Sequence, residues 1–132
     1  MTMFQPKYLV ESSILHIPEM DEEHDALFAR LDQLKQHCLG GNPVPQQEAD
    51  ALRDALVAHF RTEERLAAAA GLDFTKHAAL HETMLSTVSR SLKLIYQGQS
   101  DVFSMIQYIH LWFERHILQT DSQFAADLKR HH

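Results

Sequence analysis

Apolar residues recur at spacings of three and four along four segments of the chain, which is the pattern of amphipathic helices. The segments cover about 21–38, 46–70, 73–96 and 100–119, and the last pattern can be followed to 129. Glycine and proline separate them, at 40–45, at Gly71 and at Gly98. Asp73 and Ser100 are the expected N-caps of the third and fourth helices. Four helices with short connections predict an all-α fold, an antiparallel up-down-up-down four-helix bundle.

Residues 1–20 do not follow a helical pattern of this kind. They contain Leu9, Val10, Ile14, Leu15 and Ile17, and we expect them to form an N-terminal arm that packs on the bundle. The remaining stretch, 21–132, is expected to be a single four-helix domain, since 132 residues suit one compact core.

Histidine interrupts the apolar face of every predicted helix, and the second helix adds a carboxylate. In an antiparallel bundle these positions lie roughly 13 to 16 residues from the same end, and at about 1.5 Å per residue their heights agree within a few ångströms. The inward polar groups should therefore meet at one level of the bundle. They are His24 in the first helix, His59 and Glu63 in the second, His77 and His81 in the third, and His116 in the fourth.

The composition limits the classes of partner that the protein can bind. The formal charge of −6 argues against nucleic acid or an anionic membrane surface as a partner. No apolar run approaches the roughly 20 residues that span a bilayer, and the first residues lack the apolar stretch of a secretion signal. The only cysteine, Cys38, has no partner for an internal disulfide. These features together predict a cytoplasmic protein.

Buried imidazoles and a buried carboxylate without partners would cost several kcal/mol per ion, and a bound metal removes that cost. The pairs His59/Glu63 and His77/His81 stand four residues apart, so each pair can chelate one ion or one cluster. Asp121 follows His116 by five residues, which does not share a face of a straight α-helix. It would join the site if the helix distorts there, or if the aspartate reaches across to bridge two ions.

Five histidines and two carboxylates are too many for one zinc ion, which takes four ligands. They suit two octahedral ions that share the two carboxylates and an oxo or hydroxo bridge. Histidine with carboxylate is a ligand set typical of iron. Five imidazoles divide three and two, which leaves one coordination position open, and dioxygen would bind there in the reduced state.

Four stretches carry a specific resemblance: MDEEHDALF at 20–28, HFRTEE at 59–64, HAALH at 77–81 and WFERHILQTD at 112–121. Together and in this order they resemble the signature of the hemerythrin family in its bacterial single-domain form. The resemblance implies an oxo- or hydroxo-bridged di-iron centre with one iron held by His77, His81 and His116. It implies that His24 and His59 hold the oxygen-binding iron and that Glu63 and Asp121 bridge.

The chain departs from the family pattern at two places. Glu23 precedes His24 where glutamine is usual, and small residues at 67–70 replace a methionine that usually follows the second motif. These departures concern the shape of the pocket and not the ligand set. Leu27 and Ile117 are expected to line the oxygen site. His16, His37 and His110 lie outside the pattern and are expected to be structural or exposed.

The resemblance implies a non-haem di-iron protein that binds dioxygen reversibly for storage, delivery or scavenging, and that is not an enzyme. One alternative is an oxygen or redox sensor that acts through a separate protein or was excised from a larger signalling protein. Another is a di-iron oxidase, a peroxidase or a nitric oxide-handling enzyme. Ferritin-like di-iron enzymes carry two Glu-x-x-His motifs, and none occurs in this sequence. A four-helix protein without iron is the remaining alternative.

Overall fold

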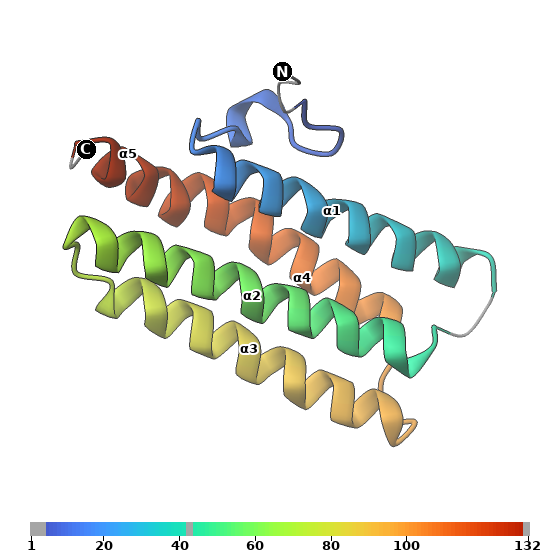
Figure 1. The fold of residues 1–132 in the computed structure, drawn as a ribbon. Coiled ribbons are helices and arrows are strands. Elements are labelled where there is room, and N and C mark those ends of the chain that lie inside the picture. Colours follow the sequence, from blue (N-terminus) through green and yellow to red (C-terminus); the bar gives the residue numbers. More distant parts are fainter. Residues whose placement is uncertain (1–4, 42–43, 131–132) are drawn as a thin grey trace.

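The computed structural model describes residues 5–41 and 44–130 and has the expected architecture, an antiparallel up-down-up-down four-helix bundle (Figure 1). Its long helices are α1 (Pro18–Leu39), α2 (Gln46–Ala70), α3 (Thr75–Tyr96) and α4 (Val102–His116). A π-helical turn, η2 (Ile117–Asp121), follows α4 and leads directly into α5 (Ser122–Arg130). Each helix of the bundle packs against two neighbours, in the order α1, α2, α3, α4 and back to α1.

The connections explain where the helices end. α2 ends at Gly71, whose φ of 69° is left-handed, and the N–H of Leu72 then donates to the carbonyl of Ala67 at 2.9 Å. Glycine adopts this conformation without the steric cost that other residues have. Of the predicted loop at 40–45, Asn42 and Pro43 lie outside the described residues.

The N-caps differ from the sequence prediction. α4 is capped by Asp101 and not by Ser100, because the Asp101 carboxylate accepts a hydrogen bond from the Ser104 N–H at 2.8 Å. α3 begins at Thr75, and its N-cap position is Phe74, one residue after the expected Asp73. The Asp73 carboxylate still accepts from the Thr75 N–H at 3.0 Å, so it satisfies a backbone donor of the first turn.

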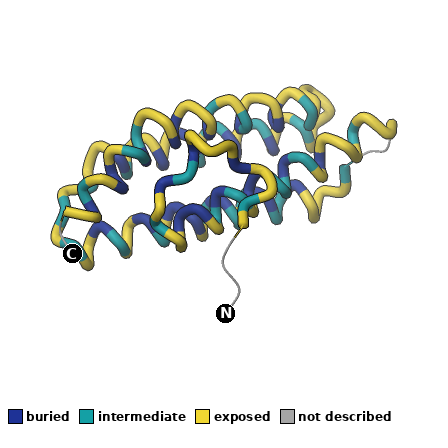
Figure 2. Tube along the Cα trace, turned by 90° about the horizontal axis from the view of Figure 1, so that it is seen from above, coloured by how far each residue is buried: buried dark blue, intermediate teal, exposed yellow. Residues whose placement is uncertain are grey.

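The core lies along the axis of the bundle, and the buried positions of all four helices face it (Figure 2). Among the largest side chains that are almost completely buried are Phe60, Phe113, Met20, Leu31 and Leu52. Burial of a leucine or phenylalanine side chain stabilises the fold by roughly 1.5–3 kcal/mol. None of the helices in 5–41 and 44–130 is long and apolar enough to cross a bilayer.

The arm lies along α1 and α4, with the short 3₁₀ helix η1 (Glu11–Ser13) in its middle (Figure 1). Leu9 and Leu15 of the arm belong to the buried core. The Asp25 carboxylate of α1 accepts hydrogen bonds from three consecutive N–H groups, those of Lys7, Tyr8 and Leu9, at 3.0, 2.7 and 3.0 Å. The arm is therefore held by specific polar contacts as well as by apolar packing.

A second carboxylate of α1 holds the end of the arm. Asp21 accepts from the N–H groups of Leu15 and His16, both at 2.9 Å, and Lys129 of α5 donates to the Leu15 carbonyl at 2.6 Å. His16 has a left-handed φ of 62°, so the chain turns sharply there before α1 begins. The last residues of the arm before α1 are therefore held by both α1 and the C-terminal helix α5.

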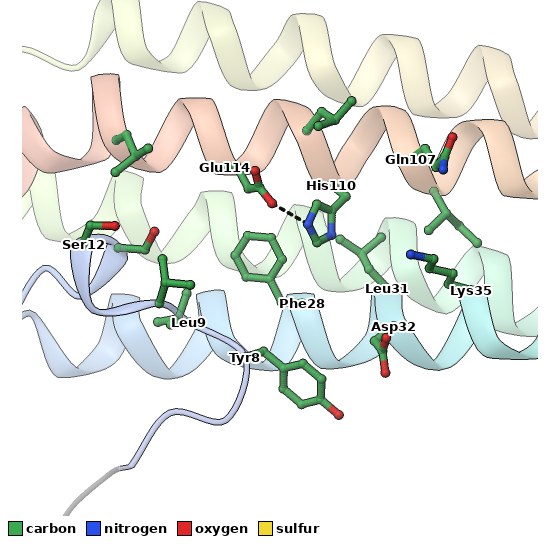
Figure 3. A pocket seen from close by; sticks show the side chains of 15 residues that line it. Tyr8, Leu9, Ser12, Phe28, Leu31, Asp32, Lys35, Gln107, His110 and Glu114 are labelled. Carbon is green, nitrogen blue, oxygen red and sulfur yellow. Dashed lines mark hydrogen bonds and ion pairs between the residues drawn. The ribbon is translucent and has the colours of Figure 1, made fainter.

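A cavity of about 440 Å³ lies between the arm, α1 and α4 (Figure 3). Phe28 and Leu31 form part of its wall, and the ring of Phe28 contacts the rings of His110 and Phe113 at 5.2 and 6.2 Å. His110 pairs with Glu114 at 2.6 Å on the same face of α4. His110 is therefore a half-buried residue away from the inward cluster of histidines, as expected from the sequence.

Candidate metal centre

The structure brings all seven predicted ligands together in the interior of the bundle. Every helix of the bundle contributes, and the contributions lie at one level. The side chains are almost completely buried: His24, Glu63 and Asp121 are 0% exposed, and the most exposed of the set, His77, is 9% exposed. The seven residues form two overlapping groups, Glu63, His77, His81, His116 and Asp121 in one and His24, His59, Glu63 and Asp121 in the other.

The two carboxylates belong to both groups, and each turns one oxygen toward each group. Glu63 Oε1 lies 3.2 Å from the Nε2 atoms of His77 and His81. Its other oxygen, Oε2, lies 2.9 Å from His59 Nε2 and 3.5 Å from His24 Nε2. Glu63 thus spans the two groups, with one oxygen in each.

Asp121 spans them in the same way. Its Oδ1 lies 3.0 Å from His77 Nε2 and 3.1 Å from His116 Nε2, whereas its Oδ2 lies 3.2 Å from His24 Nε2. The group with His77, His81 and His116 is called the three-His position below, and the group with His24 and His59 the two-His position. The three-His position has five donor atoms from the chain and the two-His position has four.

The π-helical turn places Asp121 in the cluster. A π-turn inserts an extra residue into the helix, so residues five apart come close to the same face. Ile117–Asp121 adopts this turn immediately after His116. Of the two geometries considered from the sequence, helix distortion occurs, and the aspartate also reaches both groups.

The cluster leaves buried polar atoms without hydrogen bonds. Within the described residues, nine buried side-chain nitrogen and oxygen atoms have no partner, and all nine belong to the seven cluster residues. Seven of the nine are carboxylate oxygens or Nε2 atoms that face the interior of the cluster. They lie close together without hydrogen-bond alignment, as donor atoms do around a common ion. Buried polar groups are normally hydrogen-bonded, so this arrangement fits a metal site.

The distances between the donor atoms also fit a metal site. Adjacent donors around an octahedral ion with bonds of about 2.1 Å lie about 3 Å apart. The Nε2–oxygen separations given above range from 2.9 to 3.5 Å. Histidine nitrogen with carboxylate oxygen is a donor set that binds first-row transition metals.

Electrostatics in the cluster couple the histidines to the carboxylates. Burial lowers the pKa of His59, but the carboxylates of Glu23 and Glu63 outweigh it and raise that pKa to about 9. Burial likewise opposes charge on His77, and Asp121 and Glu63 raise its pKa to about 9. The pKa of His81 is lowered, chiefly by burial. Imidazoles must be deprotonated to ligate, so binding of metal here releases protons.

Among the described residues outside the seven, Glu23 has a hydrogen-bonding contact with a cluster imidazole. Its Oε1 lies 2.7 Å from His59 Nδ1, and its Oε2 accepts a hydrogen bond from the Thr62 hydroxyl at 2.8 Å. A carboxylate on the outer nitrogen orients a ligating histidine and fixes its tautomer. The sequence marks Glu23 only as a departure from the family pattern, and its contact with α2 appears only in the structure.

A second, smaller cavity, of about 200 Å³, lies between α1 and α2 and reaches the two-His position. It is lined by Glu23, Ala26, Leu27, Arg30, Ala55, Ala58 and His59. Leu27, which was expected to line the oxygen site, is thus part of a cavity that ends at His59. Ile117, the other expected lining residue, is 0% exposed in the π-turn.

Comparison with known proteins agrees with this geometry. The model of the family described as "Hemerythrin HHE cation binding domain" matches residues 15–128. A protein of Methylococcus capsulatus (strain ATCC 33009 / NCIMB 11132 / Bath) named "Bacteriohemerythrin" is 26% identical over 111 residues, which is 82% of this chain and 85% of the relative. No solved structure gives a significant match. Since the family model covers most of the chain, this protein belongs to the hemerythrin family.

Proposed function

We propose that this protein holds two iron ions and binds dioxygen reversibly, for storage, delivery or scavenging. The observation that carries the proposal is the orientation of Glu63 and Asp121, each of which presents one oxygen to each of two groups of histidines. Two carboxylates oriented in this way suit two ions, one at each group of histidines. With a single ion, the other group would keep buried donor atoms without a metal partner.

We assign the residues to the two proposed ions from the distances between their donor atoms. His77, His81 and His116 would hold the ion at the three-His position, and His24 and His59 the ion at the two-His position, with Glu63 and Asp121 shared. When bound, the reduced iron pair would supply two electrons and one open coordination position for dioxygen. The chain would supply five donors to an octahedral ion at the three-His position and four to an ion at the two-His position. With one further ligand shared between the ions, the open position would lie beside His24 and His59.

The chain would keep water away from the metal ions and restrict how other molecules approach them. Leu27 at 4% exposure, Phe113 at 1% and Ile117 at 0% belong to the apolar interior that shields the cluster from bulk solvent. Of the seven predicted ligands, only His59, in the two-His position, lines the 200 Å³ cavity. A small neutral molecule would approach from this cavity, whereas the apolar interior keeps bulk water and acid from the buried donors.

The donor set favours binding over catalysis. Five imidazoles and two carboxylates place fewer negative charges on the metals than the carboxylate-rich sites of ferritin-like di-iron enzymes do. High-valent iron is therefore stabilised less, which favours reversible binding over substrate oxidation. On this reasoning we assign the protein as an oxygen-binding protein and not as an oxidase or peroxidase.

A sensor role is the second candidate, and the arm is the observation that favours it. Asp21 and Asp25, which hold the arm, flank His24 in α1 at distances of three residues and one residue in sequence. A change at the two-His position would act on the helical turn to which the arm is attached. The arm would then report the state of the metal centre to a partner protein.

Iron content and the visible spectrum of the same sample test the first proposal. The protein is reduced without oxygen, exposed to air and deoxygenated again. We expect about two irons per chain, no colour when reduced, colour on exposure to oxygen and loss of the colour on deoxygenation. Immediate oxidation with no lasting colour change of this kind would favour a redox sensor or an enzyme, and absence of iron would reject the metal centre.

A further inference from the structure

Aromatic rings stack face to face on all three imidazoles of the three-His position. Phe74 lies on His77 with 4.3 Å between ring centroids and 26° between planes. Phe60 lies on His81 at 3.8 Å and 9°, and Trp112 lies on His116 at 4.2 Å and 14°. Phe60 reaches His81 from another helix, whereas Phe74 and Trp112 stack on histidines three and four residues further along the chain.

The two-His position is supported differently. The nearest rings meet His24 and His59 only at larger angles and distances. Phe113 lies 6.2 Å from His24 at 65° and 6.1 Å from His59 at 47°, and Phe60 lies 5.8 Å from His59 at 49°. Within the described residues, neither imidazole of this position has a stacked aromatic neighbour.

This difference affects how firmly the imidazoles of each position are held in place before a metal ion binds. An imidazole rotates readily about its terminal side-chain bond, and binding must overcome the entropy of fixing it. A ring packed flat on the imidazole removes that freedom in advance, so the Nε2 atom already points into the site. Preorganisation of this kind increases affinity because less entropy is lost on binding.

Two independent features therefore favour tighter metal binding at the three-His position. The three-His position has five chain donors against four, and its three imidazoles are stacked. The two-His position has fewer donors and a wall of the 200 Å³ cavity beside His59.

We propose that the two metal positions load in order, the three-His position first and more tightly, and that Phe60, Phe74 and Trp112 are positioning residues for that first ion. The inference rests on the proposed metal centre and adds to it a defined single-ion state. In that state Glu63 and Asp121 bind the first ion through Oε1 and Oδ1. Their other oxygens, with His24 and His59, then form the site of the second ion, which exchanges more readily.

The order is tested by anaerobic calorimetric titration of the metal-free full-length chain with Co²⁺. We expect two binding steps whose affinities differ by at least about tenfold. His59→Ala should keep the tight step with unchanged affinity and lose the weak one. Two steps of equal affinity, or loss of the tight step in His59→Ala, would overturn the proposed order while leaving a two-metal centre in place. No binding of Co²⁺ by the wild-type chain would instead reject the metal centre itself.

The positioning role is tested by Phe74→Leu, because Phe74 contacts His77 and His81 but neither imidazole of the two-His position. We expect the tight step to weaken by about tenfold or more and the weak step to keep its affinity. Phe74→Tyr retains a stacking ring and should restore the tight step. Equal weakening of both steps, or no change in the tight one, would mean that Phe74 contributes to stability alone.

Phe28→Leu is the matched control. It removes a buried ring of the same kind whose ring contacts, among the described residues, are with His110 and Phe113 and with no cluster imidazole. Both titration steps should remain as in the wild type, although thermal stability falls. If Phe28→Leu weakened the tight step as much as Phe74→Leu does, general loosening of the core would explain both results and the positioning role would be rejected.

Discussion

His77 is the residue whose loss should be most informative at the scale of single side chains. Its Nε2 lies 3.2 Å from Glu63 Oε1 and 3.0 Å from Asp121 Oδ1, so it joins both shared carboxylates. His77→Ala removes the chelating pair with His81, and we expect stable loading with two irons to be lost. Iron analysis after gel filtration measures this, and a normal iron content would contradict the ligand assignment.

Two controls separate loss of a ligand from loss of fold. His110→Ala removes a half-buried histidine that pairs with Glu114 away from the cluster, and it should keep full iron. Leu66→Ala truncates a partly buried side chain of α2 packed on the core. It should lower the free energy of unfolding by about 1–2 kcal/mol, less than the full cost of a core truncation, and leave the iron content intact.

Glu23 should tune only the two-His position. One oxygen of its carboxylate lies 2.7 Å from His59 Nδ1, and the other accepts a hydrogen bond from the Thr62 hydroxyl. Glu23→Ala removes the group that orients His59, and we expect the affinity for the second metal ion to fall by about 10- to 100-fold. Titration of the metal-free protein with Co²⁺ measures it. Glu22→Ala, at an exposed neighbouring position, should leave both affinities unchanged, and an equal effect of the two substitutions would reject the role of Glu23.

At the scale of elements, the N-cap of α4 gives different roles to the neighbouring residues Ser100 and Asp101. The Asp101 carboxylate accepts from the Ser104 N–H at 2.8 Å and from its hydroxyl at 2.9 Å. Asp101→Ala leaves a helix N–H without its acceptor, and we expect a loss of about 1 kcal/mol in the free energy of unfolding. Urea denaturation measures the loss. Ser100→Ala should be close to neutral, and the reverse ranking would restore the cap predicted from the sequence.

The π-turn is the element that joins the end of α4 to the metal cluster. It brings His116 and Asp121, five residues apart, to a separation of 3.1 Å between Nε2 and Oδ1. π-helical turns are rare and are found mostly as single turns, frequently at functional sites. A metal held by His116 and Asp121 would stabilise the turn, and the turn would bring both ligands to the metal.

At the scale of the whole molecule, we expect the docking of the arm on the bundle to depend on the carboxylate of Asp25. Asp25 accepts three consecutive backbone N–H groups, and Asp25→Ala leaves all three without that acceptor. We expect the arm to separate from the bundle more often, and hydrogen exchange of Lys7, Tyr8 and Leu9 amides to become faster. Asp32→Ala, on the same helix without such bonds, is the control, and equal exchange in both variants would contradict the clamp.

The same measurement tests the sensor alternative. If the arm reports the state of the metal centre, exchange of these three amides in the wild-type chain should differ between metal-free and metal-loaded protein. Identical exchange in the two states would reject coupling between His24 and the arm. The oxygen-binding proposal does not depend on this result.

Some of the site is readable from spacing within one helix. The pairs His59/Glu63 and His77/His81 stand four residues apart, and the stacks of Trp112 on His116 and Phe74 on His77 use spacings of four and three. These two aromatic spacings are therefore visible in the sequence itself. The stack of Phe60 on His81 and the bond of Glu23 to His59 join different helices, and no spacing along the chain predicts them.

The sequence by itself determined the four helices, their antiparallel order and the common height of the inward histidines, because these follow from helical periodicity, short loops and a constant rise per residue. The tertiary structure alone decided which oxygen of Glu63 and of Asp121 faces which group, that the helix after His116 becomes a π-turn, and that Asp101 and not Ser100 caps α4. It also decided where the arm docks. The orientation of the carboxylates and the docking of the arm depend on the relative rotation of packed helices and on hydrogen bonds between distant segments, which local pattern does not encode. The choice between Asp101 and Ser100 depends on the residue at which α4 begins, because either side chain can serve as an N-cap.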